Sequence, residues 1–432
     1  MIDSIHLSTL LTALFSEFEL SGVSYLVLRN YEELPETTTN DVDFLIDPQQ
    51  LKEAVCCLEK VALATGWTIH NLAEFSCWTF YLYHEATFSQ VHIDFMCGIK
   101  WYSALFADHH IMFNARRRFK CFYIPSQEHE AAINLTTRLL YGGYVREKYR
   151  DGIANAATQV PENLFDVLSP WIGSQLAERF IEASKQRDWE QIERAANAAR
   201  MRVVGANLRT PLLFLSRIVY DFVRLMRRLF DSPGISLVFV GSSDDKTSSI
   251  ATEVAKAMPG TFSPERTLHV SWSPDREEEE DCMKLSGVCN TPLRNGLTSL
   301  GILLFWIVKF NYRWFRQVNP VVFRNGLVVL ERYGYDLFLN PARYGLNLSC
   351  GVSRFFLHFI PKPDLVIFLD DSQASCDGDG KPSVFFRSAI EKLRNGRVVD
   401  ASQSPKTIIE DVRAVVFGYM AGRAERRLRR FK

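Results

Sequence analysis

The sequence predicts an α/β protein in which a helical connector joins two α/β domains. Short β-prone runs alternate with helical patterns in residues 1–125, and residues 126–231 show helical patterns almost throughout. A strand pattern, a glycine-containing loop and a helix then open a second α/β domain, residues 232–432. The length of 432 residues agrees with this division, because single hydrophobic cores rarely grow beyond about 250–300 residues.

Composition and charge give no sign of a nucleic-acid-binding or secreted protein. Fifty basic residues balance fifty acidic ones, so the net charge favours neither nucleic acid nor an anionic membrane as partner. The nine cysteines show no CxxC pairing, which argues against a disulfide framework or a structural zinc site and favours a reducing cytoplasm. No secretory signal is visible, and the apolar run at residues 297–308 is too short to cross a bilayer.

In the first domain, an apolar helix pattern precedes alternating strands and helices. The expected elements are a helix through Leu7, Leu11, Leu14 and Phe18, a helix at 51–65, and strands at 42–46, 78–83 and 90–95.

Three aspartates in this domain predict a metal site. Asp41 and Asp43 are two residues apart in an apolar run, so in a strand their side chains leave the same face. Asp94 lies in a later β-prone run that we expect to pair beside the first. Carboxylates on adjacent strands suit Mg²⁺, which binds one or two carboxylates together with substrate phosphates. The alternative is that all three are solvated acids, although an aspartate inside an apolar strand needs a partner or a metal.

The order of these residues resembles the polymerase β-type nucleotidyltransferase superfamily over about residues 20–150. The sequence of residues 28–35 also resembles uncharacterised bacterial members of that superfamily. The resemblance implies that Asp41 and Asp43 hold Mg²⁺ or Mn²⁺ against the triphosphate of an NTP, with ATP the expected donor. Asp94 would hold a second metal ion and help to deprotonate the acceptor. Arg29 and Asn30 replace the usual Gly-Ser turn and would contact the phosphates. The acceptor is open: a protein side chain, an RNA end, a sugar or a small metabolite.

The connector is predicted to contain helices at 128–140, 163–184, 189–199 and 211–229, punctuated by glycine and proline. Near its start, residues 144–151 carry the basic residues Lys148 and Arg150. Either could reach nucleotide phosphates, and the alternative is a solvated helix face.

The second domain begins with the strand, glycine loop and helix that form the context of a phosphate-binding P-loop. Aligned without a gap from Gly241, Lys246 takes the position of the second glycine, Thr247 that of the lysine and Ser248 that of the serine or threonine. Two loop acids, Asp244 and Asp245, would also repel phosphate. A one-residue gap would restore Lys246 to the phosphates.

Later segments resemble thymidylate kinase-like P-loop proteins over residues 232–425, which implies a parallel sheet. The resemblance lies in residues 326–344, with Glu331 in place of Asp and Arg332 retained, in residues 362–370 and in residues 397–405. The basic lid segment of such kinases is replaced by the acidic residues 371–380. We therefore expect a weak or inactive kinase-like domain. The alternatives are a pseudoenzyme that regulates or scaffolds through nucleotide binding, and a divergent small-molecule or nucleotide kinase.

Three further features are assigned mainly to structure. His109 and His110, with His92, invite a metal interpretation, but adjacent histidines on a strand cannot face one site. The aromatic run at 305–315 is expected to be core, with a membrane-surface helix as the alternative. The basic tail at 424–432 exceeds what a helix end needs, so we predict that it contacts an acidic partner or the inner membrane face rather than the protein's own core.

Overall fold

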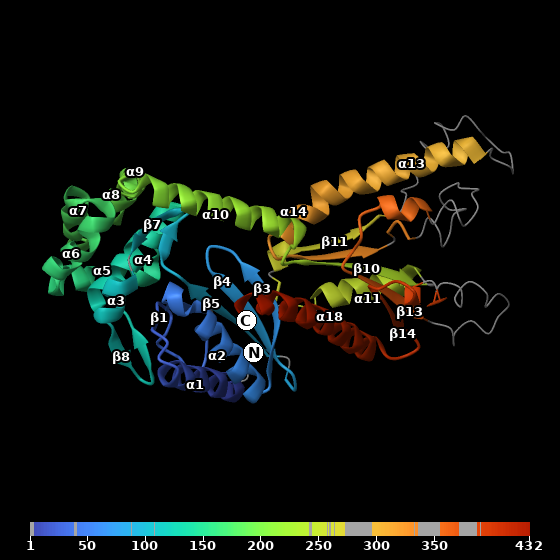
Figure 1. Cartoon of the computed structure of the whole chain (residues 1–432), viewed down its shortest axis with the longest axis horizontal. Helices are drawn as coiled ribbons and strands as arrows, with labels where there is room; N and C mark the ends of the chain where they lie inside the picture. Colours follow the sequence, from blue (N-terminus) through green and yellow to red (C-terminus); the bar gives the residue numbers. More distant parts are fainter. Residues whose placement is uncertain are drawn as a thin grey trace. The chain divides into compact units, whose positions relative to one another are not determined.

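The structure is a computed structural model whose chain divides into two compact units (Figure 1). The first unit comprises Met1–Met226 with Ala421–Lys432, and the second comprises Arg227–Met420. The described residues are 4–38, 41–87, 89–107, 109–241, 244–256, 258, 261–262, 264–272, 296–331, 333–335, 355–370, 387–388 and 390–432.

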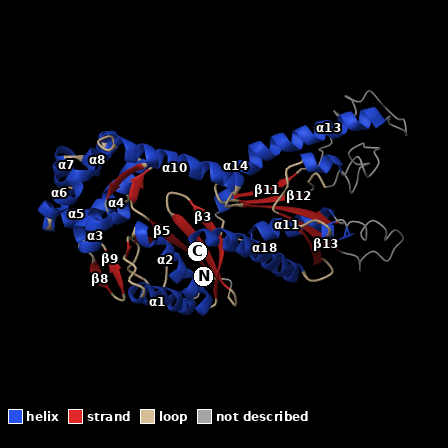
Figure 2. Cartoon of the chain, in the orientation of Figure 1, coloured by secondary structure: helices blue, strands red, loops and turns tan. Residues whose placement is uncertain are grey.

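A five-stranded sheet of order β1-β2-β5-β4-β3 forms the centre of the first unit (Figure 2). Strands β2 and β5 are parallel, and the other neighbours are antiparallel. Helices α1 and α2 share one hydrophobic core with this sheet. The elements are α1 (Ser4–Leu20), β1 (Tyr25–Val27), β2 (Val42–Ile46), η1 (Pro48–Gln50), α2 (Leu51–Ala64), β3 (Trp67–Glu74), β4 (Trp78–His84), β5 (Gln90–Met96), β6 (Ile99–Trp101), β7 (Ala104–Ala107), α3 (His109–Asn114), β8 (Arg117–Phe119) and β9 (Phe122–Ile124).

The helical segment follows the sheet within the first unit, and its helices pack on a second apolar cluster that includes Leu26 and Leu45 of the sheet. The predicted helix at 163–184 is two helices, because Gly173 adopts a φ of 84° that a helix does not contain. Pro161 stands at the start of α6, where a missing N–H costs nothing. The helices are α4 (Gln127–Gly142), α5 (Glu147–Gln159), α6 (Pro161–Ile172), α7 (Ser174–Lys185), α8 (Trp189–Arg194), α9 (Ala196–Asn207) and α10 (Pro211–Phe230).

The second unit contains an all-parallel sheet of order β11-β12-β10-β13-β14. Its central strands are continuous apolar runs, as expected where helices cover both faces of a parallel sheet. The α/β fold class, with its helical middle and parallel C-terminal sheet, is thus confirmed. The elements are β10 (Ile235–Gly241), α11 (Asp244–Lys256), η2 (Pro264–Arg266), β11 (Thr267–Ser271), α13 (Gly296–Arg313), η3 (Trp314–Val318), α14 (Asn319–Phe323), β12 (Leu327–Glu331), η5 (Leu357–Phe359), β13 (Leu365–Asp370), β14 (Gly396–Asp400), α18 (Pro405–Leu428) and η6 (Arg429–Phe431).

The C-terminal tail lies in the core of the first unit, so the prediction that it avoids the protein's own core is wrong. Leu428 and Phe431 are buried there, and the Phe431 ring packs edge-on against Trp78 with the ring centroids 4.8 Å apart. Arg427 is also buried, and its Nη1 donates to the carbonyl oxygen of Leu72 at 2.8 Å. Ala424, Leu428 and Phe431 are spaced by four and three residues and form an apolar stripe on one side of the chain end, between arginines.

The apolar run at 297–308 lies within helix α13. Its side chains divide between core and surface, since Leu303, Trp306 and Phe310 are buried whereas Val308 and Tyr312 are exposed. Among the helices of the described residues, none is long and apolar enough to cross a membrane.

Candidate active site

Two of the three predicted aspartates lie side by side on the sheet of the first unit. Asp43 of β2 and Asp94 of β5 are register partners in the parallel pair, so their side chains leave the same face of the sheet. Asp41 directly precedes β2. Residues 91, 93 and 95 of β5 are buried in the core on the opposite face. The expectation that the two β-prone runs pair is therefore confirmed.

Asp43 is buried and already has a cationic partner. The Nε of Arg29 donates to Oδ2 of Asp43 at 2.5 Å, and the side chains of Arg29 and Asp43 are 20% and 4% exposed. The sequence interpretation placed Arg29 on substrate phosphates, whereas the structure places it on the carboxylate. A guanidinium here lowers the cost of burying an ionised Asp43.

Asp94 has one buried carboxylate oxygen, Oδ1, that no neighbouring donor satisfies among the described residues. Burial, together with the charges of Asp43 and Asp41, raises the pKa of Asp94 to about 6, although hydrogen bonds from Thr79 of β4 and from Cys77 oppose this shift. A buried carboxylate oxygen without a donor is costly, which is a reason to expect a cation or a donor from outside the chain.

Asp41 is more exposed and pairs with a histidine that the sequence did not assign to this site. Nδ1 of His92 lies 3.1 Å from Oδ1 of Asp41, and this hydrogen bond lowers the pKa of Asp41. His92 and Asp94 are two residues apart on β5, so they share one face of the sheet. That spacing was visible in the sequence and is the signal that would have placed His92 here.

The Arg29-Asn30 turn meets the start of α5. Nζ of Lys148 lies 2.6 Å from Oδ1 of Asn30, and the Tyr149 hydroxyl donates to the same oxygen at 3.1 Å. Asn30 has a φ of 54°, a conformation that asparagine adopts more readily than most residues. The structure thus brings together Arg29, Asn30 and Lys148, three of the predicted phosphate contacts, and adds Tyr149 to them.

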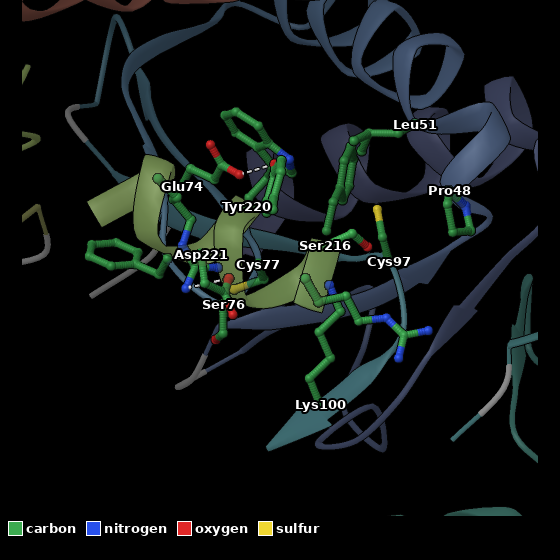
Figure 3. A pocket seen from close by; sticks show the side chains of 15 residues that line it. Pro48, Leu51, Glu74, Ser76, Cys77, Cys97, Lys100, Ser216, Tyr220 and Asp221 are labelled. Carbon is green, nitrogen blue, oxygen red and sulfur yellow. Dashed lines mark hydrogen bonds and ion pairs between the residues drawn. The ribbon is translucent and has the colours of Figure 1, made fainter. Parts of the chain in front are cut away.

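A cavity of about 530 Å³ opens within the first unit (Figure 3). Cys77 lines this cavity and also lies against Asp94; burial and the Asp94 carboxylate raise the pKa of the Cys77 thiol. The other walls come from the start of β4, the end of β5 and one face of α10, and they carry both polar and apolar side chains. They include Glu74, Trp78, Phe95, Cys97, Lys100, Ser216, Arg217, Tyr220, Asp221 and Arg224.

In the described part of the chain, the three aspartates do not form a group whose ligand atoms all lie within 4.8 Å of one another, whereas Asp47, His109 and His110 do. His109 and His110 lie on helix α3 and not on a strand, so their side chains diverge by about 100° rather than 180° and can face one site. Asp47 also accepts a hydrogen bond from the backbone N–H of Gln49, so its carboxylate has a structural role.

The predicted residues of the second unit form a different arrangement at the carboxyl edge of its sheet. Helix α11 begins at Asp244, three residues after Gly241. A side chain at Gly241 would collide with Oγ1 of Thr247, the residue at the lysine position of the motif, which is itself buried. Lys246 lies in the first turn of α11. Arg332 and the acidic segment 371–380 lie outside the described residues.

Ser248 has a partner within the sheet. Its hydroxyl donates to Oε1 of Glu331 at the end of β12 at 3.1 Å, and Nε2 of His269 on β11 lies 2.5 Å from the same oxygen. The pairing of Ser248 with Glu331 agrees with the ungapped alignment, which puts Ser248 at the serine or threonine position. His269 is a further member of this cluster that the sequence did not reveal.

Comparison with known proteins adds little to this geometry. No family model matches the sequence, and no curated protein matches it. A thymidylate kinase from Ehrlichia chaffeensis, a solved structure, is similar to part of the chain with 14% sequence identity and a TM-score of 0.33, covering 43% of this chain and 100% of that chain. A likeness at this score carries no argument about activity. The nucleotidyltransferase resemblance gains no support from these comparisons and stays a proposal.

Proposed function

We propose that the first unit is a divalent-metal-dependent nucleotidyltransferase, which moves a nucleoside monophosphate from an NTP to the hydroxyl group of an acceptor. The observation that carries the proposal is the buried Oδ1 of Asp94, which has no hydrogen-bond partner among the described residues and lies beside Asp43 on the neighbouring strand. A protein that needed these acids only for stability would gain by pairing that oxygen.

The residues present fit Mg²⁺ or Mn²⁺ in their chemistry. Asp41, Asp43 and Asp94 offer the oxygen ligands that hard divalent cations prefer. When bound, such an ion would stabilise the negative charge that develops on the transferred phosphoryl group. Mutual repulsion among the carboxylates is a physical reason for their separation in the free chain, since like charges disfavour close approach.

The remaining side chains have separate roles in the proposal. Asp94, with its pKa raised to about 6, is poised to accept the proton of the acceptor hydroxyl near neutral pH. Lys148, whose ammonium group contacts the side chain of Asn30, would neutralise charge on the triphosphate, while Arg29 stays paired with Asp43. We assign the acceptor to the cavity that Cys77 lines, because the Cys77 thiol interacts with Asp94.

For the second unit we propose a kinase-like scaffold of weak or absent activity. The buried Thr247 at the lysine position and the engagement of Ser248 by Glu331 support this interpretation. The rival proposals are a nucleotide-binding regulator or scaffold in which neither unit turns over substrate, and a divergent small-molecule or nucleotide kinase.

Labelled nucleotides distinguish these proposals. The full chain is incubated with Mg²⁺, an extract of small molecules and RNA, and NTPs labelled at either the α or the γ phosphate. Transfer of α label to an acceptor, including the protein itself, is the expected result. Transfer of γ label alone would identify a kinase and contradict the proposal. Binding of nucleotide without any transfer would favour the regulator.

A further inference from the structure

Helix α10 exposes a continuous row of large apolar side chains, which we call the α10 stripe: Leu212, Leu215, Ile218, Val219, Phe222 and Leu225. Leu212 is 81% exposed and Phe222 is 60% exposed, and no residue of the helix is buried. The spacing of three and four residues puts the stripe on one side of the helix. An exposed apolar row of this length marks an interaction surface rather than ordinary surface variation.

The polar side of α10 faces its own unit. Ser103 donates its hydroxyl hydrogen to Asp221 at 2.5 Å, and Nη1 of Arg217 donates to Oδ1 of Asn207 at 3.0 Å. Tyr220 hydrogen bonds to Glu74 in the wall of the cavity, where Figure 3 shows Ser216, Tyr220 and Asp221 on one ribbon. An ordinary surface helix turns its apolar side inward, so α10 has the reverse orientation.

The charge of α10 indicates which surface would cover the stripe. The helix contains four arginines and one aspartate, a net charge of +3, and Asp221 is already engaged by Ser103 and by Arg224 at 3.0 Å. Arg209, two residues before the helix, is exposed, as is Arg227 in its last turn. A symmetric second copy would set one cationic helix against another. An anionic lipid surface complements both the apolar stripe and the flanking arginines.

We propose that α10 binds the surface of a bilayer that contains anionic phospholipids, with the α10 stripe in the interfacial layer and the helix axis parallel to the membrane. This surface replaces the C-terminal tail, whose apolar residues are in the core, as the membrane contact of the chain. The inference does not depend on the activity proposed for the aspartates.

Co-sedimentation with vesicles tests the proposal. The full chain is mixed with vesicles of phosphatidylcholine alone, or of phosphatidylcholine and phosphatidylglycerol in equal amounts. We expect binding to the second kind only. The double substitution Leu215→Gln with Phe222→Gln should weaken this binding at least about tenfold, because two large apolar side chains would no longer enter the interfacial layer. The matched control is Leu20→Gln with Leu63→Gln, two leucines that are each 84% exposed on other helices.

Three results would overturn the proposal. The first is equal binding of the stripe variant and the wild-type chain, or no binding of either to anionic vesicles. The second is a melting temperature of the stripe variant far below that of the control variant, which would show that protein covers the stripe. The third is a wild-type dimer, in light scattering without lipid, that the stripe variant converts to a monomer; the occupant would then be a second copy.

Discussion

Each unit gathers polar side chains around a carboxylate on one of its strands, but the two groups satisfy their hydrogen bonds differently. In the second unit, Ser248 and His269 both engage the carboxylate of Glu331, so its polar groups bind one another. In the first unit, Arg29 engages Asp43 while an oxygen of Asp94 on the adjacent strand stays without a partner among the described residues. A site that retains an unsatisfied buried oxygen has reason to bind a ligand, and a site whose groups pair internally has less. The comparison therefore favours chemistry in the first unit.

The largest expected effect is on catalysis in the first unit. Asp94→Asn should lower nucleotidyl transfer by about 1000-fold, which corresponds to about 4 kcal/mol in barrier height, because the proton acceptor and a metal ligand are lost together. Initial rates with α-labelled NTP measure this loss. The matched control is Asp151→Asn, the same change on an exposed carboxylate of α5. If the Asp94 variant transfers nucleotide at the wild-type rate, Asp94 is not part of the active site.

The second expected effect is that substitutions of Asp94 and Asp43 change the stability of the fold in opposite directions. Because the pKa of Asp94 is raised to about 6, the folded state holds its proton more tightly than the unfolded state does. Its favourable contribution is complete below about pH 4 and disappears as the pH rises through 6. Without metal at pH 7.5, Asp94→Asn should therefore raise the free energy of unfolding, by up to about 3 kcal/mol.

Asp43→Asn should lower the free energy of unfolding by about 3 kcal/mol, because Arg29 loses its charged partner in a mostly buried position. Chemical denaturation of both variants at pH 7.5 and pH 4 in EDTA measures the contrast. The gain for Asp94→Asn should vanish at the lower pH. If both substitutions change stability in the same direction at pH 7.5, the proposed division of roles between the two aspartates is wrong.

A smaller effect tests the internal pairing of the second unit. Ser248→Ala removes the hydroxyl that donates to Glu331, and we expect a loss of about 1 kcal/mol in the unfolding free energy with no change in nucleotide turnover. Chemical denaturation and NTP turnover are measured on the same preparation. Unchanged stability with lost turnover would instead show that Ser248 serves a bound nucleotide, and the contrast between the units would disappear.

The smallest effect is expected for Lys246→Ala. The ungapped position of Lys246, supported by the pairing of Ser248 with Glu331, puts it away from the phosphate-binding lysine position. Turnover of NTP should therefore stay within about threefold of wild type. A loss of more than about 100-fold, equivalent to about 2.7 kcal/mol, would restore the second unit as a kinase.

Local patterns were sufficient to predict the strands that carry Asp43 and Asp94, because alternation in a five-residue to seven-residue run shows which side chains share a face. For the second unit, the resemblance to thymidylate kinase-like proteins implied a parallel sheet, and the structure has one, although its strand order was not predicted. Partners were harder to predict. The bond between Arg29 and Asp43 joins residues 14 apart through a turn, and nothing in the composition of that turn distinguishes a guanidinium that binds phosphate from one that binds a carboxylate.

The orientation of α10 and the burial of the tail escaped prediction for a related reason. An amphipathic pattern identifies a helix and its apolar side, but the usual inference that this side is buried depends on distant partners such as Ser103. In the tail, five basic residues predicted exposure, although Ala424, Leu428 and Phe431 occupy one side of the chain end and are buried. In both cases charge and hydrophobicity gave opposite indications, and long-range contacts decided between them.

Helix α18 starts in the second unit at Pro405 and ends in the first unit at Leu428. The second unit is thus an insertion within the first, and the ribosome must synthesise about two hundred residues between α10 and the side chains that complete the sheet's core. Until Leu428 and Phe431 emerge, Trp78 and its neighbours lack part of their packing. The core on this face of the sheet is therefore complete only after the second unit has been made.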